Sequence, residues 1–231
     1  MRSITLTAAL AVLMTMGCLT ATAQTVAFRW VENWRFTGHG TCQTAPFRVW
    51  SGAWRVAYEP KGAGAFAVDV CVPATGARET VTTQAATRRQ GLSGVWRGKG
   101  QRELAYLAVR AAQQPWELRV SQYMDKPTEW QFMKWQSPTH RLLPFGGWQF
   151  APGERERTLE LAESVGRMTF RQMQPGRLSV EVIDESGATV AAMVSVEPGT
   201  LETWFYRPGV YTLRASAIDT SWSVLVETLA N

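Results

Sequence analysis

The chain has 231 residues, a net charge of +5 at neutral pH, two histidines and three cysteines. This length suffices for one large domain or two small ones, each burying its own core. The cysteines lie far apart and form no CxxC pair, which together with two isolated histidines excludes an ordinary zinc site. We expect no metal and no cofactor.

The N-terminus has the three parts of an export signal. Arg2 gives a positive start, residues 4–16 are mostly apolar, and Ala21-Thr22-Ala23 offers the small-x-small pattern that precedes signal peptidase cleavage. The apolar run is too short to span a bilayer. The pattern predicts a signal peptide over residues 1–23 and a periplasmic or secreted protein.

A lipid anchor is the alternative at this end. Residues 15–18 read Thr-Met-Gly-Cys and resemble a bacterial lipobox, in which the cysteine is acylated. Lipoboxes favour leucine at the first of these positions, whereas this chain has Thr15. We therefore favour cleavage after Ala23 and keep an anchor at Cys18 as the second reading.

Two cysteines, Cys42 and Cys71, remain in the mature chain on either route. An oxidising compartment favours a disulfide between them. The loop between them would contribute about 3.5 kcal/mol in the chain-entropy model. Two buried free thiols are the other reading.

The mature chain is predicted to be all-β. Apolar and polar residues alternate in five short runs, at 54–58, 66–70, 116–120, 178–182 and 222–226, separated by glycine-rich turns. Leu107 and Trp116 are spaced like Leu213 and Trp222, and residues 66–76 parallel 178–187, which indicates an internal repeat.

This repeat predicts two antiparallel β-sandwich modules of jelly-roll type. We place the first at 24–122, an aromatic and proline-rich connector at 123–153, and the second at 154–231. A single sandwich in which both repeats share one core is the alternative. Residues 155–165 could form one short helix, and residues 158–161 could equally form a strand that enters the second module.

The end of the chain resembles a known kind of secreted module. Pro208-Gly209-Val210-Tyr211-Thr212-Leu213 followed by Trp222 is similar to the closing strands of bacterial jelly-roll accessory modules, such as prepeptidase C-terminal-like domains. The resemblance covers about the last 75 residues. It implies a secreted accessory β-sandwich and carries over no site residues. The acidic residues with which some of these modules bind calcium are not apparent here.

Residues 87–102 form the most basic stretch of the chain. Arginine presents a planar fork to carboxylate or phosphate, and tryptophan offers a flat face to a sugar ring. A solvated loop is the other reading, because basicity alone gives only non-specific attraction. The candidate binding residues in this stretch are Arg88, Arg89, Trp96, Arg97 and Lys99.

The tryptophans divide into two groups. Trp54, Trp116 and Trp222 begin alternating strands and are expected in the core. Five others lack that pattern, and they are candidates for exposure or for packing between modules: Trp30, Trp34, Trp130, Trp135 and Trp148. Of these, Trp130, Trp135 and Trp148 join the candidate binding residues.

No catalytic constellation is found in the sequence. His39 between glycines and His140 each lack a nucleophile or metal partner, and no GxSxG, HExxH, P-loop or dinucleotide motif is present. The glutamates between 154 and 163 alternate with arginines and predict an ion-paired surface. Asp184 is interpreted as a turn residue.

Three functions follow in order of preference. The first is a non-enzymatic envelope or extracellular protein that binds a polysaccharide, another anionic polymer or a protein partner. The second is a structural or assembly subunit of an envelope complex, and the third is a hydrolase without a recognisable motif. Nucleic acid is not expected as a partner of an exported protein.

Overall fold

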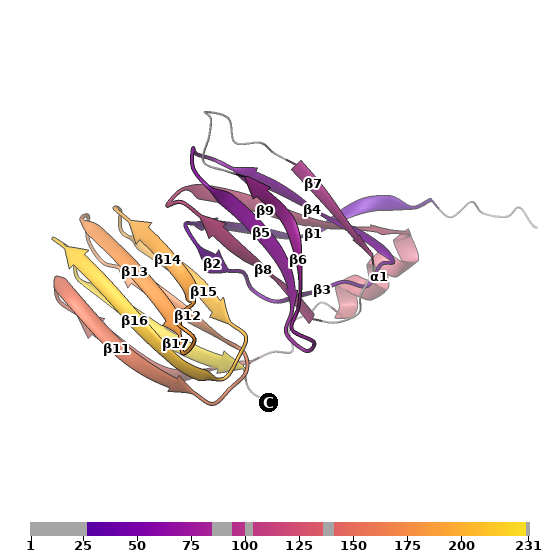
Figure 1. Ribbon diagram of the computed structural model, residues 1–231. Coiled ribbons are helices and arrows are strands. Elements are labelled where there is room, and N and C mark those ends of the chain that lie inside the picture. Colours follow the sequence, from indigo (N-terminus) through magenta and orange to yellow (C-terminus); the bar gives the residue numbers. More distant parts are fainter. Residues whose placement is uncertain (1–26, 85–93, 100–103, 136–140, 230–231) are drawn as a thin grey trace, which may run out of the picture.

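The computed structural model describes residues 27–84, 94–99, 104–135 and 141–229. The described chain is nearly all β, with one short helix, and every strand pair is antiparallel (Figure 1). The first half comprises β1 (Arg29–His39), β2 (Cys42–Gln43), β3 (Phe47–Arg48), β4 (Ala53–Pro60), β5 (Phe66–Val72), β6 (Ala77–Gln84), β7 (Gly94–Lys99), β8 (Leu104–Ala111), β9 (Pro115–Met124) and α1 (Lys126–Trp135). The second half comprises β10 (Leu142–Phe150), β11 (Gly153–Leu161), β12 (Gly166–Gln172), β13 (Arg177–Asp184), β14 (Thr189–Ser195), β15 (Gly199–Phe205), β16 (Gly209–Ile218) and β17 (Trp222–Leu229).

Each half supplies two sheets, and the strand order repeats between halves. The first half has the orders β1-β9-β4-β7 and β2-β8-β5-β6, with the short β3 also paired to β8. The second half has β10-β17-β12-β15 and β11-β16-β13-β14. With β3 set aside, the strands correspond one to one in chain order, so the two halves have the same topology.

The core agrees with the alternation read from the sequence. Trp54, Trp116 and Trp222 are 1%, 2% and 1% exposed, as expected from their places at the start of alternating strands. Buried apolar side chains of both halves form one contiguous cluster. The two halves therefore share apolar contact across their boundary.

Polar and aromatic contacts also join the halves. Thr41 and Ala192 exchange two backbone hydrogen bonds of 2.9 and 2.8 Å. The Tyr206 hydroxyl donates to the carbonyl of Thr44 at 2.6 Å, and its ring stacks on Tyr106 with centroids 3.8 Å apart and planes 8° apart. These contacts lie between β2 and β8 of the first half and the β14–β15 region of the second (Figure 1).

The segment 123–153, predicted as a connector, is built into both halves. Its first part contains α1, whose Asp125 caps the helix by accepting a hydrogen bond from the Thr128 amide at 2.8 Å. Its last part contains β10, which pairs with β17 and so belongs to the second half's sheets. Residues 153–161 form β11 and pair with β16, so the strand alternative for that region is the correct one.

The predicted Cys42–Cys71 disulfide is wrong, because both thiols are free and buried. Cys42 pairs with Val109 on one side of β8, and Cys71 pairs with Tyr106 on the other side. Two strand spacings separate them by about 9.5 Å, beyond the reach of about 7 Å between bridged Cα atoms. Val109 and Tyr106 also point to opposite faces of the sheet, because they lie three positions apart along β8.

We expect both of these cysteines to react with a thiol reagent once the unreduced protein is unfolded. In the native state both are less than 8% exposed, so labelling should be slow. Mass spectrometry after alkylation in urea, with and without prior reduction, measures this directly. Equal mass additions in the two samples are expected. Addition only after reduction would instead show that the two cysteines form a disulfide.

Candidate functional site

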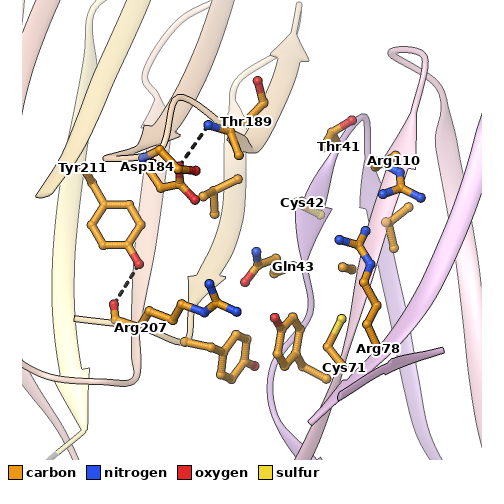
Figure 2. Close-up of a pocket in the computed structure, with 17 residues that line it drawn as sticks. Thr41, Cys42, Gln43, Cys71, Arg78, Arg110, Asp184, Thr189, Arg207 and Tyr211 are labelled. Carbon is orange, nitrogen blue, oxygen red and sulfur yellow. Dashed lines mark hydrogen bonds between the residues drawn. The ribbon is translucent and has the colours of Figure 1, made fainter. Parts of the chain in front are cut away.

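A cleft of about 510 Å³ lies between the two halves. Its first wall comes from β2, β5, β6 and β8, and its second from the β13–β14 turn, β14 and the chain from Tyr206 to Tyr211 (Figure 2). The volume lies in the range of small-molecule sites. Neither half contains both walls, so the site depends on the way the halves meet.

The first wall is polar because of strand parity. On β8, Leu107 and Val109 face the core and are at most 1% exposed, whereas Tyr106, Ala108 and Arg110 point to the opposite face. Cross-strand neighbours share a face, so the pairs Cys71 with Tyr106 and Asp69 with Ala108 place those side chains on the same outer surface. The sheet thus presents polar groups to the second half.

Asp69 holds two arginines together on this wall. Its side chain is 1% exposed, and its Oδ2 accepts from Arg78 Nε at 2.8 Å and also from Arg78 Nη2, while Arg110 Nη2 lies 3.0 Å away. The arginine side chains are 50% and 52% exposed. One buried carboxylate therefore positions two half-exposed guanidiniums, and this group of three carries a net charge of +1.

Arg207 approaches from the opposite wall. Its guanidinium projects across the cleft toward Gln43 (Figure 2), and it makes no ion pair with any residue that the structure describes. The loop that carries it is held by the Tyr211 hydroxyl, which donates to the Arg207 carbonyl at 2.7 Å. A cation that is unpaired within the described chain thus faces the Asp69-anchored arginine pair.

The acidic member of the second wall is already engaged. Asp184 Oδ1 accepts hydrogen bonds from Ser186 N at 3.0 Å, Ser186 Oγ at 2.6 Å and Ala188 N at 2.9 Å, which confirms its role as a turn residue. The three cleft arginines are thus balanced by two carboxylates, Asp184 and the buried Asp69 behind Arg78 and Arg110, which leaves a net charge of +1. Electrostatically, the cleft favours an anion.

Two further groups complete the polar surface. Gln43 Oε1 is buried and accepts no hydrogen bond from the described residues, so its amide retains hydrogen-bonding capacity. The stacked Tyr106–Tyr206 pair closes one end of the cleft. Burial raises the pKa of both tyrosine hydroxyls, and the neighbouring Cys71 raises that of Tyr106 further. Both side chains therefore stay neutral at physiological pH.

Cys71 brings a potentially nucleophilic thiol to the cleft lining, but its surroundings keep this thiol protonated. Burial raises the pKa of its thiol, and the Tyr106 hydroxyl and Arg78 offset this only in part. The thiolate is the reactive form. Cys42, on the core face, has a pKa raised by burial to about 12. Neither thiol has the lowered pKa of a catalytic cysteine.

Of the sequence-predicted binding residues, the three whose side chains the structure describes lie outside this cleft. Arg97 lies on β7, directly across from Arg55 of β4, and is exposed. Trp130 is 63% exposed on α1, and Trp148 is partly buried against the core with the Arg157 guanidinium 3.9 Å from its ring centroid. Arg88 and Arg89 lie outside the described residues, as do the side chains of Trp96, Lys99 and Trp135.

The residues that form the cleft could not be singled out in the sequence. Arg78, Arg110 and Arg207 lie far apart in the sequence, and none of them belongs to a basic cluster. The only available signal is Asp69, a carboxylate inside the strongly apolar run of β5, since a buried charge needs a partner.

The other candidate groups lie apart from one another in the described part of the chain. Among the described residues, no three His, Cys, Asp or Glu side chains gather as metal ligands. His39 is the last residue of β1, and His140 lies outside the described residues. Glu156 of β11 pairs with Arg214 at 3.0 Å, as the ion-paired surface predicts.

Comparisons with known proteins do not identify a family. No family model and no curated protein matches the sequence. A conserved protein of unknown function from Pseudomonas aeruginosa PAO1 aligns over 88% of this chain and 83% of its own, at 12% identity and a TM-score of 0.27. The PBSX exported protein XepA aligns over 87% and 86%, at 8% identity and a TM-score of 0.28. At such TM-scores neither likeness supports a conclusion about fold or function.

Proposed function

We propose that this protein is a non-enzymatic binding protein that takes an anionic segment of an envelope polysaccharide or related polymer into the cleft between its halves. The observation that carries the proposal is the placement of Arg207 opposite the Asp69-anchored pair of Arg78 and Arg110. Arginine forks bind carboxylate and phosphate oxygens in bidentate fashion. An anion between the walls would be contacted from both halves.

The groups around the cleft favour binding over catalysis. A hydrolase needs a base, a nucleophile or a metal in reach of its substrate. The described lining offers arginines, an amide, neutral tyrosines and a protonated thiol. These groups donate hydrogen bonds and position a ligand, but none of them is set to transfer a proton at neutral pH.

We also infer that each half is a β-sandwich of jelly-roll type and that the protein is exported. Eight strands arranged in two sheets are characteristic of a jelly roll, and the strand order common to both halves supports this interpretation. Export rests on the signal pattern of residues 1–23. Among the described residues, no helix has the length and apolar character required to cross a membrane.

Titration calorimetry with three small probes tests the proposed function. Trigalacturonate presents carboxylates, tripolyphosphate presents phosphates, and maltotriose is neutral. We expect the wild type to bind at least one anionic probe, with an affinity that falls as the salt concentration rises, and we expect no binding of maltotriose. Arg207→Gln should weaken that binding about tenfold or more, because it removes a charge-assisted contact.

Arg171→Gln is the matched control, because this exposed arginine on β12 lies outside the cleft. It should bind like the wild type. Equal affinity of Arg207→Gln and Arg171→Gln would refute the cleft as the binding site. If replacing Arg97 abolishes binding instead, the binding site lies in the basic stretch of residues 87–102.

A further inference from the structure

One side of helix α1 packs against β1. Phe132 is fully buried and meets Trp34 edge-on, with ring centroids 5.2 Å apart and planes 85° apart. Glu129 Oε2 lies 2.8 Å from Arg29 Nη2, which joins the helix to the start of β1. Together with the Asp125 cap, these contacts determine which side of the helix faces solvent.

The outer side of α1 is apolar at its centre and basic at both ends. Trp130 and Met133 are 63% and 60% exposed. Lys126 and Lys134 lie four residues before and after Trp130, on the same helix face, and Lys134 Nζ is 5.8 Å from the Trp130 ring centroid. We call Lys126, Trp130, Met133 and Lys134 the helix surface.

The charge of the helix surface is positive. The helix surface has two acidic neighbours among the described residues. Glu129 is shared between Arg29 and Lys126, with oxygen–nitrogen distances of 2.8 and 3.4 Å, and Asp125 accepts a hydrogen bond from the Thr128 amide. The three basic residues Arg29, Lys126 and Lys134 therefore exceed these two carboxylates by one charge. The hydrogen bond from Arg29 lowers the pKa of Glu129, so this carboxylate keeps its negative charge near neutral pH.

The position of the helix surface separates it from the cleft. Figure 1 shows α1 at the end of the first half that points away from the second half. β1 begins beside it, because Arg29 Nη2 donates a hydrogen bond to Glu129 Oε2. Phe28, the residue before Arg29, is also 52% exposed.

We propose that the helix surface docks this protein onto an anionic lipid bilayer. Tryptophan is favoured at the boundary between headgroups and acyl chains, and methionine adds apolar area there. Lysines on either side extend their ammonium groups toward anionic headgroups, each adding attraction near the surface. The proposal is independent of the cleft and does not require the proposed ligand.

Vesicle co-sedimentation of the mature chain, beginning at Gln24, tests the proposal without the apolar leader. The probes are phosphatidylglycerol–phosphatidylcholine vesicles and vesicles of phosphatidylcholine alone, at low salt. The wild type should sediment with the anionic vesicles. Trp130→Ser with Met133→Ser should reduce partitioning about tenfold or more, and Lys126→Gln with Lys134→Gln should remove the preference for the anionic lipid.

Met173→Ser with Val196→Ser is the matched control, because these exposed apolar residues lie in the second half. That variant, and the cleft variant Arg207→Gln, should sediment like the wild type. The proposal is overturned if the wild type does not sediment, if both vesicle types bind it equally, or if the helix-surface and control variants behave alike. Loss of sedimentation in Arg207→Gln would also overturn it, since the cleft would then contact the lipid.

Discussion

Replacing Tyr206 with alanine is expected to lower the free energy of unfolding by about 3–4 kcal/mol, the largest effect of any change at the boundary between the halves. Tyr206 is 6% exposed, stacks on Tyr106 and bonds the Thr44 carbonyl. The substitution removes a buried ring that contacts both halves and leaves a cavity at the end of the cleft. Urea unfolding, monitored by circular dichroism, measures the change.

Two further variants serve as controls. One measures the contribution of the Tyr206 hydroxyl alone, and the other measures the effect of removing a more exposed tyrosine. Tyr206→Phe keeps the stack but leaves the Thr44 carbonyl unpaired, so a loss of about 1–2 kcal/mol is expected. Tyr123→Ala removes a ring that is 41% exposed, and should cost less than about 1 kcal/mol. If Tyr206→Ala and Tyr123→Ala unfold at the same urea concentration, the Tyr206 contact does not hold the halves together.

Replacing Asp69 with alanine is expected to cost about 2–3 kcal/mol of stability. Removing one partner from a buried ion pair is strongly destabilising, by about 3–5 kcal/mol where the remaining charge stays buried. Here Arg78 and Arg110 are about half-exposed and can regain water, which reduces the penalty. Loss of the carboxylate also leaves two guanidiniums in mutual repulsion on one sheet face.

A double-mutant cycle identifies that repulsion. In the Asp69→Ala background, Arg78→Gln should recover part of the lost stability, whereas in the wild-type background the same substitution should destabilise the protein. Additive effects of the two substitutions would show that Asp69 does not hold the arginine pair. Arg171→Gln, away from the cleft, should have little effect in either background.

The sequence predicts much of the fold because side-chain alternation reports which face of a strand is buried. The buried positions of Trp54, Trp116 and Trp222 follow from it, and so does the correspondence of β8 and β9 with β16 and β17. The sequence pattern does not predict α1, although Asp125 followed by Lys126-Pro127 is a good start signal. The aromatic and proline-rich composition of the segment obscured it.

The candidate site was not predictable because it depends on strand order and on the meeting of two halves. Nothing local in the sequence shows that β8 lies between Cys42 and Cys71. Likewise, nothing local in the sequence brings Arg207 opposite Arg78. The charges of the basic stretch of residues 87–102 are adjacent in sequence, whereas the cleft arginines become neighbours only in the folded chain.

Hydrogen–deuterium exchange with and without the anionic probe that binds most tightly tests the central claim most directly. The cleft predicts slower amide exchange in β5, in β8 and in the chain from Tyr206 to Tyr211 when the probe is bound. Exchange in α1 and β7 should not change. Protection confined to α1 or β7, with the cleft segments unchanged under saturating probe, would contradict the account.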